Sequence, residues 1–151
     1  MRDKGFIAEH RGGLLLRQQH YQLLKWACDC TEHVMNSFDE IIDMRIINAL
    51  KTARDWADGK VTVGDARKAS LGAIAAARDK PNAVIVAIAR SAGHAVATAH
   101  MADHSLRAAA YAIKAIELSG ESIEDERNWQ NLQLPLEIRD LVLTARKKIN
   151  Q

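Results

Sequence analysis

The side chains of this chain that could do chemistry gather in one stretch, between Arg90 and His104. His100 and His104 are four positions apart with Asp103 between them. Two imidazoles and a carboxylate are a known set of metal ligands, and on one unbroken helix all three would share a face. His94 precedes His100 by six positions, which turns it about 120° away on the same helix. It could join the set only if another element brought it there.

The metal signal is weak, because no His-Glu-x-x-His motif, second histidine pair or acidic cluster at ligand spacing accompanies it. A buried histidine more often makes a hydrogen bond within the core. We therefore expect no metal and no cofactor, and we expect His94 and His100 to be largely buried, each with a polar partner. The candidates for contact with a partner or a ligand are His94, His100, Asp103, His104 and Arg90.

The sequence carries no complete catalytic motif. It has no Gly-x-Ser-x-Gly and no phosphate-binding glycine loop. Cys30 and His33 are three positions apart, but Cys30 lies on the apolar stripe of its helix, where burial raises the pKa of a thiol. The interpretation is a protein that is not an enzyme. The alternative is a metal- or ligand-binding helical enzyme that uses the three histidines and Asp103 of the central stretch.

Composition indicates a single globular domain. The chain has 151 residues, 48% of them hydrophobic and 26% charged, with a net charge of +2. That charge is too small to predict nucleic-acid binding. Cys28 and Cys30 point to opposite sides of a helix and cannot bridge each other, which suits a reducing compartment. The N-terminal residues are polar and lack the apolar core of a signal peptide, so we expect a cytoplasmic protein.

An alanine-rich stretch from residue 81 to residue 120 organises the chain. Apolar or small residues surround its first half on all sides, which is typical of a buried helix. It is long enough to span a membrane, but Arg90 at its centre would cost roughly 2.5–3.5 kcal/mol on insertion scales, so we expect no membrane span. An unbroken helix over the whole stretch would be longer than a domain of this size. We therefore predict a break near Met101–Asp103, with Asp103 as the cap of the following helix.

The remaining pattern is helical throughout. Periodic apolar residues, capping signals, glycines and prolines predict helices over about 14–38, 43–59, 62–79, 81–101, 103–119, 122–132 and 135–149. The expected fold is all-α, with six to eight helices in stacked αα-hairpins or an irregular bundle around the buried Ala-rich central helix. Residues 1–13 are expected to form a flexible N-terminal arm, and residues 14–151 a single all-helical domain.

The segment AIARSAGHAVATAHMADHSLRAAAYAIKA resembles the most recognisable part of a family of predicted all-helical immunity proteins from bacterial toxin–immunity systems. Similar texture occurs in HYQLLKWACDCTEHV, DMRIINALKTARDWADG, GDARKASLGAIAAARD and NWQNLQLPLEIRDLV, so the likeness runs from about Leu16 to Val142. The resemblance implies a small cytoplasmic protein that binds a cognate toxin and neutralises it without catalysis. It supplies no catalytic residues.

A structural helical protein that forms homo-oligomers is a further alternative. The mild basic charge also bears on the immunity interpretation, because inhibitors of nucleases are often acidic and compete with nucleic acid for a basic cleft. A nuclease target held by acidic mimicry is therefore disfavoured.

Overall fold

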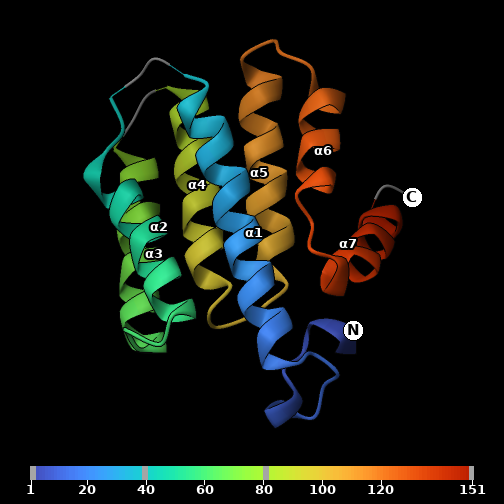
Figure 1. The fold of residues 1–151 in the computed structure, drawn as a ribbon. Coiled ribbons are helices and arrows are strands. Elements are labelled where there is room, and N and C mark those ends of the chain that lie inside the picture. The colour runs from blue at the N-terminus through green and yellow to red at the C-terminus, as the bar shows by residue number, and fades with distance from the viewer. Residues whose placement is uncertain (1–2, 39–40, 80–81, 150–151) are drawn as a thin grey trace.

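The computed structural model describes residues 3–38, 41–79 and 82–149. Within these ranges the chain forms seven α-helices and no strand, as predicted (Figure 1). The helices are α1 (Arg17–Asn36), α2 (Met44–Ala57), α3 (Val63–Arg78), α4 (Ala83–Ala97), α5 (His104–Leu118), α6 (Ile123–Leu132) and α7 (Leu136–Ile149). Two short 3-10 helices, Lys4–Phe6 and Glu9–Arg11, precede them.

The predicted central helix is α4, which packs against α1, α2, α3 and α5. Figure 1 shows α4 and α5 in the middle of the molecule, with α2 and α3 on one side and α6 and α7 on the other. The buried face of α4 consists largely of alanine, and Ala89, Ala92 and Ala95 are fully buried. Among the described residues, no helix is both long and apolar enough to cross a membrane.

Two buried hydroxyl groups tie three helices together at the centre. Ser91 on α4 donates to the backbone carbonyl of Ala108 on α5 at 2.7 Å, because a carbonyl can only accept. Its oxygen lies 2.8 Å from the hydroxyl oxygen of Thr31 on α1. The single hydrogen of the Thr31 hydroxyl faces both this oxygen and the backbone carbonyl of Ala27, 3.1 Å away on its own helix. Thr31 and Ser91 are 1% and 0% exposed. Each hydroxyl therefore has its partner, and the burial of polar groups in this small-residue core carries no unpaired cost.

The predicted break in the central stretch is present: α4 ends at Ala97, and α5 begins at His104. The predicted capping role of Asp103 is wrong. Asp103 occupies the N-cap position, but its side chain makes no capping hydrogen bond. Its backbone is already in the right-handed helical region, at φ −70° and ψ −12°, whereas a capping side chain needs an extended backbone to reach back to the helix.

The other predicted caps are formed. Thr62 accepts from the backbone N–H of Asp65 and Asp65 accepts from that of Thr62, a complete capping box. Asp43 caps α2 through the N–H of Arg45 at 2.8 Å, and Ser122 caps α6. Helix α4 begins at Ala83 with the side chain of Asn82 as its cap. Pro81, predicted at the start of this helix, lies outside the described residues.

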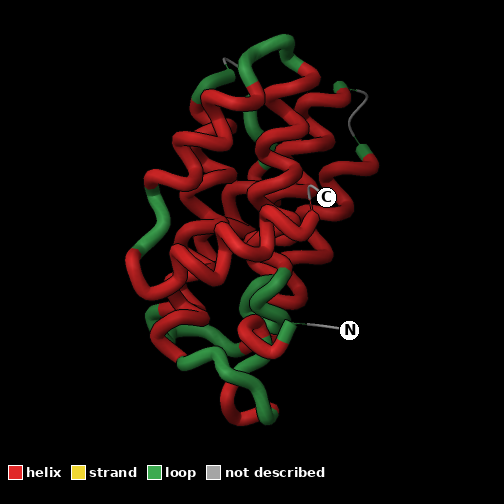
Figure 2. The backbone as a smooth tube through the Cα atoms, turned by 90° about the vertical axis from the view of Figure 1, so that its right-hand side faces the viewer, coloured by secondary structure: helices red, strands yellow, loops and turns green. Residues whose placement is uncertain are grey.

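Residues 3–13, expected as a flexible arm, fold back against the ends of the helices. Phe6 and Leu15 are 2% and 1% exposed, and backbone hydrogen bonds join Leu14 to Lys4 and Leu15 to Ile7. Figure 2 shows these loops gathered at the N-terminal end of the molecule. The flexibility of the arm stays a prediction. Leu16, at the N-cap of α1, is 52% exposed, because it precedes the first helical turn.

Packing around α4 leads to a stability prediction. Ala95 is 0% exposed, so the three extra carbon atoms of Ala95→Leu have no space and would force neighbouring helices apart. We expect the free energy of unfolding to fall by about 1–3 kcal/mol. Chemical unfolding followed by circular dichroism measures this. Ala99, just beyond the end of α4, is 4% exposed and should respond in the same direction.

The matched contrast is Gly93→Ala on the same helix. A Cβ atom at Gly93 would lie 3.7 Å from Ala73 and 3.7 Å from Ile74, which is ordinary van der Waals contact. The variant should therefore gain helix propensity and stabilise the protein by about 0.5–1 kcal/mol. If both variants destabilised the protein equally, the contacts around α4 would be tighter than these distances indicate.

Candidate functional site

The turn between α4 and α5 brings His94 and His104 together, although they are ten residues apart. Their Nδ1 atoms are 2.8 Å from each other. The ring centroids are 5.0 Å apart with planes inclined by 23°, a separation that the N–N distance and the two ring radii account for. The rings therefore meet edge to edge through a directed N–H···N hydrogen bond, with one ring as donor and the other as acceptor.

This geometry limits the protonation of the pair. If both rings were imidazolium, two N–H groups would point at each other across 2.8 Å. Burial, followed by the electrostatic effect of His104 and Arg107, lowers the pKa of His94 to about 4. His94 is therefore neutral at physiological pH.

Tyr111 and Arg90 extend the pair into a cluster. The Tyr111 ring lies parallel to that of His94, at 5.4 Å and 7°. The Arg90 guanidinium carbon lies 5.9 Å from the centre of the Tyr111 ring. We call Arg90, His94, His104 and Tyr111 the α4–α5 cluster. Sequence reasoning missed Tyr111, although its spacing of seven from His104, two helical turns, places it on the same face of α5.

The metal-ligand set considered from the sequence is not assembled. Among the residues that the structure describes, no group of three or more His, Cys, Asp or Glu side chains could hold a metal ion. His100 turns to α3 instead, where the Arg67 guanidinium lies 3.3 and 3.4 Å from its two ring nitrogens. Asp103 is partly buried in the turn before α5. The break in the helix is the reason, because it removes the common face that one continuous helix would have provided.

His94 and His100 do have polar partners, as predicted, but neither is largely buried. Both rings are only partly covered. The physical reason is that the inner faces of α4 are packed with small residues, so that His94 lies at the edge of α4 beside α5, and His100 lies in the turn after α4, facing α3. A polar ring there keeps an edge in contact with solvent.

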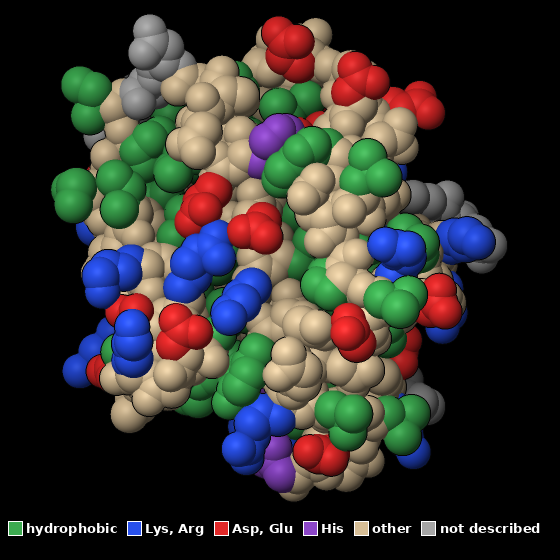
Figure 3. Space-filling model, in the orientation of Figure 1, with side chains coloured by type: hydrophobic (Ala, Val, Ile, Leu, Met, Phe, Trp, Pro, Cys, Tyr) green, Lys and Arg blue, Asp and Glu red, His purple; other side chains and the backbone are tan. Residues whose placement is uncertain are grey.

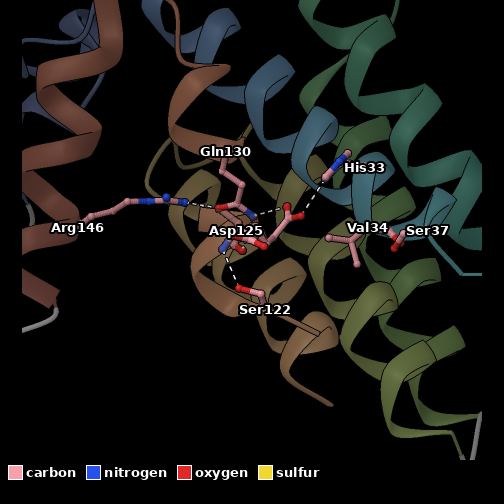
Figure 4. Close-up of polar contacts among 9 residues, drawn as sticks. His33, Val34, Ser37, Ser122, Asp125, Gln130 and Arg146 are labelled. Atoms are coloured by element: carbon pink, nitrogen blue, oxygen red, sulfur yellow. Dashed lines mark hydrogen bonds and ion pairs between the residues drawn. The ribbon is translucent and has the colours of Figure 1, made fainter. Parts of the chain in front are cut away.

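A second polar cluster joins α6 and α7 to the rest of the molecule (Figure 4). His33 on α1 lies 2.9 Å from a carboxylate oxygen of Glu126 on α6, and its ring stacks on Trp129 at 3.5 Å. Gln130 donates from Nε2 to the backbone carbonyl of Ala109 at 3.1 Å and accepts from Arg146. We call His33, Glu126, Gln130 and Arg146 the α6–α7 cluster.

Arg146 lies in the last turn of α7, where a basic side chain could simply face solvent and offset the helix dipole. Its guanidinium turns inward, donates to Asn131 at 2.7 Å and to Gln130, and lies 5.1 Å from the centre of the Trp26 ring. Burial lowers the pKa of Arg146 and raises that of Glu126, which His33 opposes. Because its members form hydrogen bonds and an ion pair with one another, we interpret this cluster as a structural link between α1, α6 and α7 rather than as a binding site.

The two cysteines offer no nucleophile. Cys28 and Cys30 are free and fully buried, on opposite flanks of α1. Burial raises the pKa of Cys28 to about 12 and that of Cys30 well above its ordinary value. Both thiols are therefore protonated at physiological pH.

Fold and site together define a small all-α domain in which the exposed polar groups of α4 and α5 are arranged by a tight interhelical turn. The chain belongs to the family described as Imm-5 like putative immunity protein, whose model matches residues 13–137. The matched region contains the whole α4–α5 cluster. No curated protein and no solved structure matches the chain.

The lowered pKa of His94 predicts a pH dependence of stability. As pH falls from about 6.5 towards 4, a histidine in the unfolded chain takes up a proton while His94 in the folded protein does not. The contribution of neutral His94 to the free energy of unfolding is therefore fully present above about pH 6.5 and is progressively lost as the pH falls below that value. Between pH 7 and pH 5 the loss assigned to His94 should be about 1–2 kcal/mol, since its partial exposure reduces the effect.

The measurement compares urea unfolding of the wild type with that of His94→Gln at both pH values. The variant should lose about 1–2 kcal/mol less than the wild type over this range. His10→Gln, at an exposed position, is the control and should behave as the wild type does. Equal pH dependence in all three proteins would contradict the assignment to His94.

The two acceptors of Arg146 give another prediction. Arg146→Lys keeps the charge but cannot reach Asn131 and Gln130 at once or lie flat against Trp26. We expect the free energy of unfolding to fall by about 1–2 kcal/mol. Lys147→Ala, at the exposed neighbouring position, should change it by less than about 0.5 kcal/mol. If Arg146→Lys left the free energy of unfolding unchanged, the positive charge of this side chain would account for its whole contribution to stability.

Proposed function

We propose that this protein is an immunity protein that binds a cognate bacterial toxin in the cytoplasm and neutralises it by binding alone, without catalysis. The observation that carries the proposal is the match of the family model to residues 13–137, which includes α1 to α6. The neutral His94 and the buried, protonated cysteines agree with a role that needs no turnover.

The net charge of the chain limits the kinds of toxin that the protein could bind. A net charge of +2 gives no broad acidic surface with which to imitate nucleic acid. On the face shown in Figure 3, acidic and basic side chains alternate. Among the described residues, Arg54 pairs with Asp29 at 2.8 Å and with Glu32 at 2.9 Å. A toxin whose site is a strongly basic cleft is therefore a poor match for this surface.

The α4–α5 cluster is the surface that we assign to the toxin. Arg90 is exposed and lies beside the ring of Tyr111, and Arg and Tyr are among the residues that most often dominate the energy of protein interfaces. The hydrogen bond between His94 and His104 and the parallel packing of His94 on Tyr111 already order these rings. Binding there would lose little side-chain entropy.

The test is co-expression with the toxin encoded beside this protein. We expect growth to be rescued and a stable complex to be recovered in a pull-down. A toxin that kills equally with and without the protein would refute the proposed function for that pair.

The binding surface is tested separately, by the affinity of purified variants. Arg90→Ala and Tyr111→Ala should each weaken toxin binding about tenfold or more. Arg78→Ala, an exposed arginine at the end of α3, is the matched control and should bind as the wild type does. Rescue that survives both cluster variants at full affinity would place the interface elsewhere while leaving the immunity function in place.

A further inference from the structure

A cavity of about 190 Å³ lies between the N-terminal segment and the ends of the helices. Its lining comes from residues 6–17, from the first turn of α1, from the last turn of α2 and from the turn between α4 and α5. A cavity of about 150 Å³ in a protein core is large enough for benzene. The cavity described here therefore has room for one six-membered ring with a small substituent.

The inner wall of the cavity is apolar and aromatic. Phe6, Leu15 and Ala102 line it and are at most 2% exposed. The rings of Tyr21 and Trp56 also line the cavity and meet edge to face at 5.2 Å and 81°. These surfaces favour the flat apolar body of a ligand.

His20 completes this wall and is held in one tautomer. Its Nε2 atom lies 2.6 Å from the backbone carbonyl of Thr98, which can only accept, so Nε2 carries the proton. Its ring is inclined to that of Trp56 at 5.0 Å. Burial lowers the pKa of His20; the bond to Thr98 opposes this, and the positive charges of His10 and Arg11 lower it further. His20 therefore serves as a neutral, oriented part of the wall.

The mouth of the cavity is positively charged. Arg11 and Arg17 line it and are exposed, and among the described residues of the lining the one carboxylate is that of Glu9. In the part of the chain that the structure describes, no ion pair joins either guanidinium to a carboxylate. Figure 3 shows basic side chains and a histidine together at this end of the molecule. Two guanidinium groups without carboxylate partners favour an incoming anion.

We infer that this cavity is a binding site for a small carboxylate carried on a single aromatic ring. The ring enters between Trp56 and the buried Phe6–Leu15 surface, and the carboxylate stays at the mouth with Arg11 and Arg17. The inference does not depend on toxin binding, since the α4–α5 cluster is built from other residues.

The positive charge of Arg11 and Arg17 distinguishes this cavity from an aromatic cage that binds cations. Tyr21 and Trp56 alone could attract a cation through their ring faces. A cation would, however, have to pass Arg11 and Arg17 with only Glu9 to offset them. The mouth therefore selects for an anion, while the aromatic wall selects for a ring.

Three ligands of one shape test the inference: benzoate, benzamide and benzamidine, which are anionic, neutral and cationic. Binding is followed by the NMR shifts of the Trp56 indole and the His20 ring. We expect benzoate to bind with a Kd of about 1 mM or tighter, benzamide more weakly, and benzamidine most weakly. No binding of benzoate, equal binding of all three, or preference for benzamidine would each overturn the inference.

Variants of Arg11 and Arg17 test whether these side chains bind the carboxylate of benzoate. Arg17→Gln and Arg11→Gln should each weaken benzoate binding about tenfold and leave benzamide binding unchanged. Arg78→Gln, at the far end of α3 from the cavity, is the matched control. Circular dichroism shows whether each variant is folded, and the shift of the Trp56 indole with benzamide shows whether the cavity is intact. If all three variants bound benzoate equally, its carboxylate would not be held by the arginines at the mouth, and the inference would fail.

Discussion

The close packing of small residues around α4 is the constraint on which this structure depends. Alanine buries little surface by itself, so a core of alanines is stable only when helix backbones approach closely enough for many dispersion contacts. At that distance the hydroxyls of Thr31 and Ser91 reach each other and the carbonyl of Ala108. These bonds join α1, α4 and α5 at one level. The position of α5 relative to α4 along their axes then decides which of their side chains can contact one another.

The turn from Thr98 to Asp103 contributes to both the α4–α5 cluster and the cavity. By reversing the chain it sets His104 against His94, which creates the edge-to-edge imidazole pair and the stack with Tyr111. The same turn carries His100 and Ala102 into the lining of the cavity, and His20 holds it through the carbonyl of Thr98. A proposed protein interface and a proposed ligand site thus share one short connection.

The C-terminal helices are attached by polar as well as apolar contacts. Helices α1 to α5 meet through an apolar core, to which α7 adds Ile138 and Val142. Helices α6 and α7 are held in addition by the polar α6–α7 cluster. Such a cluster is specific in geometry, because Gln130 and Arg146 each need two separate partners. It is also sensitive to loss of a single member, since the remaining polar groups would be left buried without hydrogen bonds.

The sequence by itself determined the helical class, the extent of most helices, the caps at Asp43 and Thr62, and the break near residue 101. These follow from periodicity and from short-range hydrogen bonds, which a window of a few residues contains. Only the tertiary structure decided the pairing of His94 with His104, the inward turn of Arg146, and the cavity beneath the N-terminal segment. Each of these joins residues brought together by packing, and a side chain of Arg146's length reaches either solvent or interior from the same helical position. Local sequence does not record what lies across the interface, so the direction of such a side chain is settled by the neighbour it meets.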